Sequence, residues 1–173
     1  MPSTYTLISS NVLSSSAASV TFSAIPATYT DLVLRVSARS TRSATFDFFE
    51  VRFNADSAAN YGSTEMYGDG STASSVRQSS QNFAYPEFMN GNTSTSDTFA
   101  STELYIPNYL VSANKPFSSL SVSETNSATG AYVDAYAGLW TNTAAITSIS
   151  LKPGSTRSFV SGSSFYLYGI KNS

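Results

Sequence analysis

The chain has 173 residues, a net charge of −2 and neither cysteine nor histidine. A charged fraction of 12% beside an aromatic fraction of 13% excludes a disordered chain, which shows the opposite balance. Without cysteine there are no disulfides, and without histidine as well the usual zinc and copper sites lose their commonest ligands.

Residue types that form strands and turns dominate the composition. The chain has 35 serines and 19 threonines against only ten leucines. Threonine, tyrosine, phenylalanine and valine favour pleated, half-buried surfaces, and serine suits turns and solvent-facing positions. One domain is the usual expectation for this length. We therefore predict a single all-β domain over residues 1–173.

The segments expected to be strands follow one another with turn residues between them. In chain order they are residues 4–13, 19–25, 31–40, 46–54, 63–68, 74–80, 82–89, 97–106, 117–125, 131–140, 145–152 and 164–171. Short strands at intervals of about 8–12 residues are typical of sandwiches and barrels. We expect about ten to twelve strands in two packed antiparallel sheets, a β-sandwich with jelly-roll-like connections.

Alternation of residue types predicts which side chains face the core. Leu32, Leu34 and Val36 share one face of the segment 31–40, which is the period of two of a half-buried strand. The segment 46–54 repeats this pattern. The residues expected to point inward are Leu32, Leu34, Val36, Phe49, Val51, Phe53, Ile149, Leu151 and Leu167.

Neither a membrane nor a nucleic acid is an expected partner. Residues 1–13 lack the basic start and apolar run of a signal peptide, and no segment approaches the ~20 apolar residues that span a bilayer. The nine basic residues are scattered, whereas nucleic-acid binding needs several on one surface. Arg35, Arg39 and Arg42 lie near one another, but we expect a solvated strand end there rather than an anion site.

The stretch RFNADSAANYGS, residues 52–63, breaks the run of strand-like sequence. Its Asn54, Asp56 and Asn60 fit a calcium loop, a sugar-binding edge or a turn. Calcium needs about six to eight oxygens, and Ala58 and the lack of a following glutamate break the spacing of a calcium loop. Asparagine and aspartate also bond their own backbone and tolerate the left-handed conformation. We predict a turn.

A second loop candidate is YGDGST, residues 67–72. Its glycine spacing matches a weak phosphate-binding loop, but the following lysine and helix are missing. Asp-Gly is a usual signal of a hairpin turn. We therefore predict a hairpin here.

No catalytic site can be assembled from the sequence. There is no G-x-S-x-G elbow, and without histidine a serine would need Lys115, Lys152 or Lys171 as its base. Two carboxylates can hydrolyse a glycosidic bond, but acids on strands more often face solvent. The acids on predicted strands are Glu50, Glu103, Glu124 and Asp134. We predict no enzyme, no cofactor and no metal site.

Trp140 is the only tryptophan of the chain. It can stack on a sugar, with Tyr136 nearby as a second ring. Its position after Gly138 and Leu139, at the end of a predicted strand, instead favours a role as a core anchor. The eleven tyrosines are further candidates for contacts at a protein interface, where tyrosine is enriched.

Five longer stretches stand out. They are FSAIPATYTDLVLRVSARS (22–40), VRFNADSAANYGS (51–63), TELYIPNY (102–109), YAGLWTNTAAITSISL (136–151) and SGSSFYLYGIK (161–171). In this order, and over nearly the whole chain, they resemble small structural proteins of tailed bacteriophages, particularly phages of aquatic bacteria such as cyanophages. The resemblance implies a β-sandwich virion component without catalysis. In it FNADSAANY is a turn, and Phe53 and Tyr61, on either side of the turn, pack into the core.

The resemblance implies one of two roles. A capsid decoration (cement) protein binds the outer capsid surface and clamps neighbouring major capsid subunits, whereas a tail-fibre or receptor-binding module contacts host surface glycans. A chain of 173 residues leaves no room for a coiled shaft or baseplate anchor, which favours decoration. We expect a homo-oligomer, a trimer at a threefold or quasi-threefold position on the capsid exterior, assembled in the host cytoplasm, with the major capsid protein as partner.

Overall fold

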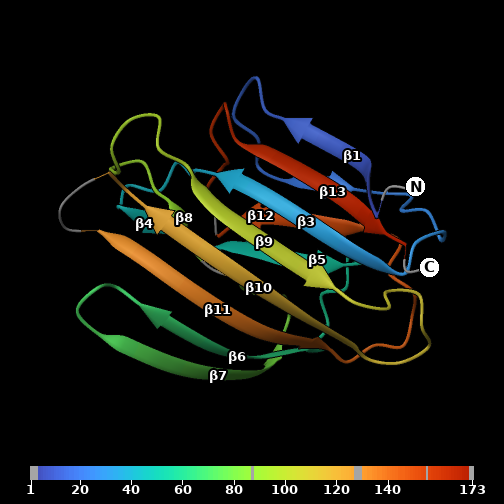
Figure 1. Ribbon diagram of the computed structural model, residues 1–173. Helices are drawn as coiled ribbons and strands as arrows, with labels where there is room; N and C mark the ends of the chain where they lie inside the picture. Colours follow the sequence, from blue (N-terminus) through green and yellow to red (C-terminus); the bar gives the residue numbers. More distant parts are fainter. Residues whose placement is uncertain (1–3, 87, 127–129, 155, 172–173) are drawn as a thin grey trace.

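A computed structural model describes residues 4–86, 88–126, 130–154 and 156–171 (Figure 1). These residues form thirteen β-strands and no helix, and every strand pair within a sheet is antiparallel. The predicted all-β class is confirmed. The described part of the chain accordingly has no helix long and apolar enough to cross a membrane.

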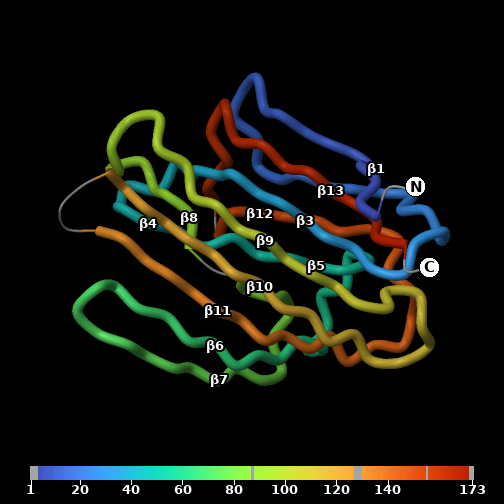
Figure 2. The backbone as a smooth tube through the Cα atoms, in the orientation of Figure 1, coloured from blue at the N-terminus to red at the C-terminus, as the bar shows by residue number. Residues whose placement is uncertain are grey.

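Eight strands form one large sheet. In spatial order they are β1 (Tyr5–Val12), β13 (Ser164–Ile170), β3 (Asp31–Ala38), β9 (Ala100–Ile106), β10 (Lys115–Glu124), β11 (Ala131–Trp140), β6 (Tyr61–Gly68) and β7 (Ala73–Gln81). The first and last strands of the chain therefore lie side by side, as Figure 2 shows at the edge of the sheet. The strands β1 and β7 are the two edges.

Two smaller sheets complete the fold. One has the order β2 (Val20–Phe22), β12 (Ile149–Pro153) and β5 (Phe49–Phe53), and the other pairs β4 (Phe46–Asp47) with β8 (Met89–Asn90). The strands β12 and β5 lie behind the large sheet in the view of Figure 1. The side chains between the large sheet and these strands form the core.

The predicted inward-facing residues all belong to this core. Each of the nine is at most 4% exposed, and all belong to one hydrophobic cluster. The cluster also holds Trp140, Tyr61 and Phe165, which come from three different strands of the large sheet. The alternation predicts these positions well because one face of β3 and of β5 packs against the other layer.

Some segments differ from the predicted strands. Among the described residues of 82–89, only Ala84, which bridges to Val51, and Met89, which begins β8 and pairs with Asp47, take part in strand pairing. Pro86 has no N–H to donate to a ladder. Residue 87 lies outside the described residues. In residues 145–152 the strand begins only at Ile149, because the preceding backbone N–H groups of Thr147 and Ser148 donate to the side chain of Asn54 instead.

Candidate interaction surface

The side of the large sheet turned away from the core carries an exposed apolar patch. Its five members lie on β10, β11 and β6 and are between 36% and 65% exposed. We call them the apolar patch: Met66, Leu120, Val122, Val133 and Leu139. Contiguous exposed apolar surface of this kind is typical of interaction sites.

Cross-strand pairing brings four of the five patch members together. Leu120 pairs with Ala135, which pairs with Met66 in the same row across three strands. In the next row Val122 pairs with Val133. Directly opposite side chains lie about 4.5–5.5 Å apart at Cβ, and diagonal neighbours in successive rows lie about 7–8 Å apart, within reach of long side chains. Leu139 lies two rows beyond Ala135 along β11, opposite Pro116.

Beneath the patch, the inward side of the same strands is polar over part of their length. In β10 the side chains of Ser119, Ser121 and Ser123 are buried while Leu120 and Val122 face out. A half-buried strand ordinarily places its apolar residues inward. The polarity of β10 is therefore inverted.

The neighbouring strands share the inversion. In β11 the carboxyl of Asp134 is buried while Val133 is exposed, and in β6 Glu65 is buried while Met66 is exposed. Over this stretch three adjacent strands turn polar groups to the interior and apolar groups to the outside, whereas further along the same strands Phe117, Tyr136, Trp140 and Tyr61 point into the core. This arrangement favours a partner that covers the outer side.

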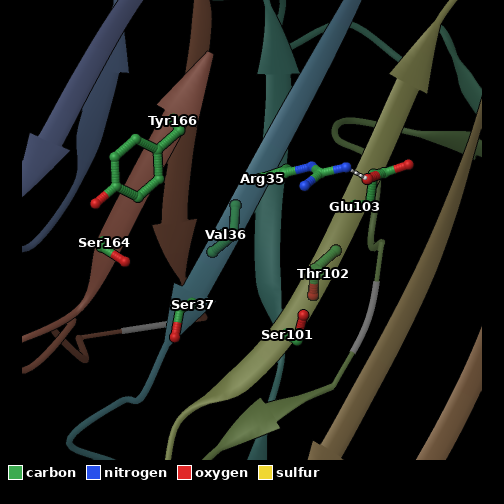
Figure 3. Close-up of a pocket in the computed structure, with 8 residues that line it drawn as sticks. All are labelled: Arg35, Val36, Ser37, Ser101, Thr102, Glu103, Ser164 and Tyr166. Atoms are coloured by element: carbon green, nitrogen blue, oxygen red, sulfur yellow. Dashed lines mark ion pairs between the residues drawn. The ribbon is translucent and has the colours of Figure 1, made fainter. Parts of the chain in front are cut away.

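Beside the patch this outer side is shallowly hollowed. A depression of about 340 Å³ lies over β13, β3 and β9, and Arg35 pairs there with Glu103 at 2.8 Å. Figure 3 shows the residues that line it and this ion pair. Tyr166 lines the same depression. Both charged side chains are about half exposed, so their ion pair contributes little to stability. A second depression of about 330 Å³ shares Glu103 and reaches Leu120.

The three arginines considered for anion binding do not form a shared site. Arg35 pairs with Glu103, whereas Arg39 is only 7% exposed. Arg39 donates to the backbone carbonyls of Asn92, Ser94 and Thr95, so it holds a loop in place. The expectation of a solvated strand end fits Arg35 but is wrong for Arg39.

The stretch 52–63 is a turn, as predicted. Asn54 and Ala55 have φ values of 52° and 55°, and the N–H of Asp56 donates to the carbonyl of Phe53 at 2.9 Å. Positive φ at two successive positions is the conformation that asparagine tolerates. The Asn54 side chain also accepts from the N–H of Thr147 at 2.8 Å, which ties the turn to the chain before β12.

The oxygens of Asp56 are occupied by the protein itself. They accept from the N–H of Ala58, from Asn60 Nδ2 at 2.8 Å and from Trp140 Nε1 at 2.7 Å. Burial opposes ionisation, but the hydrogen bonds from Asn60, Trp140 and Ala58 outweigh it and lower the pKa of Asp56. No group of three or more potential metal-binding acids exists among the described residues.

The structure places both aromatic candidates for a sugar platform in the core. Trp140 is 1% exposed and Tyr136 is 4% exposed, and the ring of Tyr136 stacks on Phe117. The prediction of a core anchor is confirmed. Phe53 and Tyr61 also pack together, with ring centroids 6.2 Å apart, beside the turn.

Residues 67–72 form the predicted hairpin turn between β6 and β7. Asp69 Oδ1 accepts from the N–H groups of Ser71 at 2.9 Å and Thr72 at 2.7 Å. Gly70 has a φ of 88°, which glycine adopts without strain. These bonds lower the pKa of Asp69, with the Thr72 N–H making the largest contribution.

The acids considered for catalysis are not grouped by the fold. Glu103 and Glu124 face solvent, as expected of strand acids. Glu50 and Asp134 are buried, so the expectation is wrong for these two. Glu50 pairs with Arg52 at 3.2 Å.

Lys115, considered as a base for a serine, is almost fully buried. Its Nζ donates to the carbonyls of Val111 and Ala113 at 2.6 Å each, and to that of Thr143 at 3.4 Å. Burial lowers its pKa. The ammonium is thus held by loop carbonyls at one end of β10.

The sequence did not predict a pair of buried acids on β6 and β11. Glu65 on β6 and Asp134 on β11 are diagonal neighbours on the inward side of the sheet, because Glu65 pairs with Tyr136 and Tyr67 with Asp134. Neither oxygen of Asp134 has a hydrogen-bond partner among the described residues. Burial, and then the charge of Glu65, raise the pKa of Asp134 to about 7.

The alternation of side chains between the two faces of a strand is the signal that could have identified this pair. Asp134 is six residues before the buried Trp140, and Glu65 is four residues after the buried Tyr61, so each shares the inward face with its aromatic neighbour. Once Trp140 and Tyr61 are placed in the core, the alternation predicts that Asp134 and Glu65 are buried as well.

Comparisons with protein-family models, with curated proteins and with solved structures find no match to the chain. Proposals about function therefore start from the chain's own residues and their geometry.

Proposed function

We propose that the chain is a structural protein of a tailed-phage virion, a capsid decoration protein that binds the outer capsid surface and clamps neighbouring major capsid subunits. The proposal takes the fold as a jelly-roll-like sandwich of two layers. It assigns the contact to the apolar patch on the large sheet. The stretches that resemble phage structural proteins support the class of protein, and the inverted polarity of β10 supports the mode of action.

The inverted polarity is the observation that carries the proposal. Exposed Leu120 and Val133 lose water contact only when a partner covers them, and full burial of such a side chain contributes about 1.5–3 kcal/mol. The five patch members together offer a driving force on the order of 5–10 kcal/mol before the costs of association. A decoration protein with many identical contacts needs no stronger single site.

The edge strands supply the contacts between copies in this proposal. Strand β1 is exposed at nearly every position, and β7 is largely exposed too. Unpaired edges of this kind are routinely covered in native proteins. We propose a homotrimer on the capsid exterior that has no catalytic activity and binds neither nucleic acid nor membrane.

Immunogold labelling of intact virions with an antibody to the purified chain tests this function. The expected result is signal over the head in regular copies, seen by electron microscopy. Signal confined to the tail tip would replace decoration with receptor binding, and host surface glycans would then be the partner to assay.

A further inference from the structure

A further concave feature lies on the inward side of β6 and β7. It is a cleft of about 420 Å³ between the β6–β7 hairpin and the aromatic residues around β4 and β8. We call it the aromatic cleft. Its lining residues are Phe46, Phe48, Glu65, Tyr67, Asp69, Thr72, Ser74, Phe88 and Tyr132.

Five aromatic side chains form its wall. The rings of Phe88 and Tyr132 stack with centroids 4.5 Å apart, and the ring of Phe46 lies 4.6 Å from that of Tyr132. Tyr67 contacts Phe88 at 5.6 Å. The faces of such rings carry negative electrostatic potential and attract cations.

This wall already holds one cation of the chain. The guanidinium carbon of Arg42 lies 5.5 Å from the ring centroid of Phe46 and 5.6 Å from that of Phe48. Both distances are within the range of cation–π attraction. Arg42 itself does not line the cleft, so its guanidinium leaves the cleft side of the wall to a ligand.

The cleft also contains a buried, unpaired carboxylate. Glu65 is 5% exposed and lines the cleft, and its side-chain carboxylate makes no hydrogen bond or ion pair among the described residues, whereas its backbone carbonyl accepts from Ser75 Oγ. Asp134 is its diagonal neighbour, and its carboxylate likewise has no hydrogen-bond partner among the described residues. A buried polar group without a partner points to a missing ion or water. Within the described part of the chain, no basic side chain lines the cleft to neutralise Glu65.

We propose that the aromatic cleft binds an organic ammonium cation, with the ring faces around Phe88 and Tyr132 packing on its alkyl groups and the Glu65 carboxylate supplying the countercharge. Asp69 and the hydroxyl groups of Thr72 and Ser74 line the hairpin side. A hard metal ion fits less well, because calcium takes about six to eight oxygen ligands and rings make up most of this wall. The ligand chemistry is a quaternary or primary ammonium, from a free small molecule or from a lysine side chain of a partner protein.

The binding test compares two molecules of one shape. Choline and its uncharged isostere 3,3-dimethylbutan-1-ol are titrated into the full chain by calorimetry at pH 8 and constant ionic strength. Choline is expected to bind roughly tenfold more tightly or better, because the isostere lacks the cation–π and carboxylate attraction. Equal binding of the two molecules, or binding of neither at millimolar concentration, overturns the proposal.

Variants assign the binding to the cleft. Glu65→Gln keeps shape and removes the countercharge, so choline affinity is expected to fall roughly tenfold. Glu103→Gln, on the other side of the large sheet, is the matched control and is expected to bind as the wild type does. If Glu65→Gln unfolds, Phe48→Leu tests the wall in its place, with the same expected direction. Unchanged affinity in the folded variant refutes the assignment.

The source of the ammonium group is settled by a third titration. Nα-acetyl-lysine methylamide represents a lysine of a partner, and choline represents a free quaternary ammonium. Tighter binding of the lysine analogue assigns the cleft to a protein partner, and tighter binding of choline assigns it to a small molecule. Saturable binding of neutral methyl glycosides with no response to either cation would make the cleft a sugar site and end the proposal.

Discussion

The carboxyl of Asp134 sets the strongest pH dependence expected of this protein. Its pKa is raised to about 7 in the folded state, first by burial and then by Glu65, against an ordinary value of 3.8. The folded state therefore binds this proton more tightly than the unfolded state. Its stabilising contribution is fully present below the unfolded pKa and is lost as pH rises through about 7.

Asp134→Asn is expected to remove this loss. At pH 8 the variant should exceed the wild type in free energy of unfolding by about 2 kcal/mol, and at pH 5 the two should lie closer together. Urea unfolding at both pH values measures the difference. Glu103→Gln, which removes an exposed carboxylate, should show no gain at pH 8. Parallel pH profiles for wild type and Asp134→Asn would contradict the prediction.

Asp56 is expected to be the most sensitive residue of the turn. Asp56→Ala leaves the buried indole N–H of Trp140 without its acceptor and removes the bond to Asn60. We expect a loss of about 1–3 kcal/mol in the free energy of unfolding, measured in urea. Ser57→Ala, an exposed neighbour, should change the value by less than about 0.5 kcal/mol. Addition of calcium or EDTA should leave the melting temperature unchanged, and a calcium-dependent rise would instead identify a metal loop.

Among the elements, β10 and β11 depend on a glycine for close packing. A Cβ added at Gly138 would come within 2.2 Å of the ring of Phe117 on the paired position of β10. Gly138→Ala should therefore lower the free energy of unfolding by about 1–3 kcal/mol. At Gly68, on β6, the nearest atom to an added Cβ is 3.7 Å away, so Gly68→Ala is the matched control. Equal tolerance of both changes in thermal unfolding would show that the Phe117 ring moves freely.

The sequence predicts elements best where alternation and burial agree. In β3 and β5 the apolar residues face inward, and the predicted core there is correct. In β10 the same rule would place the apolar Leu120 inward. Leu120 lies three positions after the buried Phe117, so the two side chains point to opposite faces of the sheet and Leu120 is exposed. Periodicity marks the two faces of a strand but does not say which one is buried.

The candidate sites were harder to predict than the strands. The turn at Asn54 and the hairpin at Asp69 follow from local side-chain bonding, so sequence alone identifies them. The aromatic cleft joins Phe46, Glu65 and Tyr132 from three distant segments. The pairing of β11 with β6 brings Tyr132 near Glu65, and the separate pairing of β4 with β8 positions Phe46, so no local pattern encodes the cleft.

At the scale of the whole molecule, the two sides of the large sheet are suited to different tasks. The inward side holds the core and, beyond it, the aromatic cleft, while the outward side presents the apolar patch. A ligand in the cleft and a partner on the patch therefore need not compete for the same surface. The edges β1 and β7 remain for contacts between copies.

The last prediction concerns the assembled shell. Under the decoration proposal the chain binds the assembled capsid and not its dissociated subunits, so it shifts the equilibrium toward assembly by mass action. At a concentration one hundred times the dissociation constant this amounts to about 2.7 kcal/mol per site. Heating virions stripped of the protein, with and without added chain, should show a higher temperature of DNA release when the chain is present.

Leu120→Lys decides whether the apolar patch makes this contact. The substitution places a charge at the centre of the patch, where a covering partner would have to desolvate it, and it should abolish both capsid binding and the rise in release temperature. Thr21→Lys places the same charge on an exposed position of β2, in the other layer, and should preserve both.

Sedimentation of each variant reports the oligomeric state, expected to be a trimer. Because Leu120 is already exposed, the free energy of unfolding should not fall. If Leu120→Lys protects the shell as well as Thr21→Lys does, the patch is not the capsid contact, and the edge strands become the surface to test.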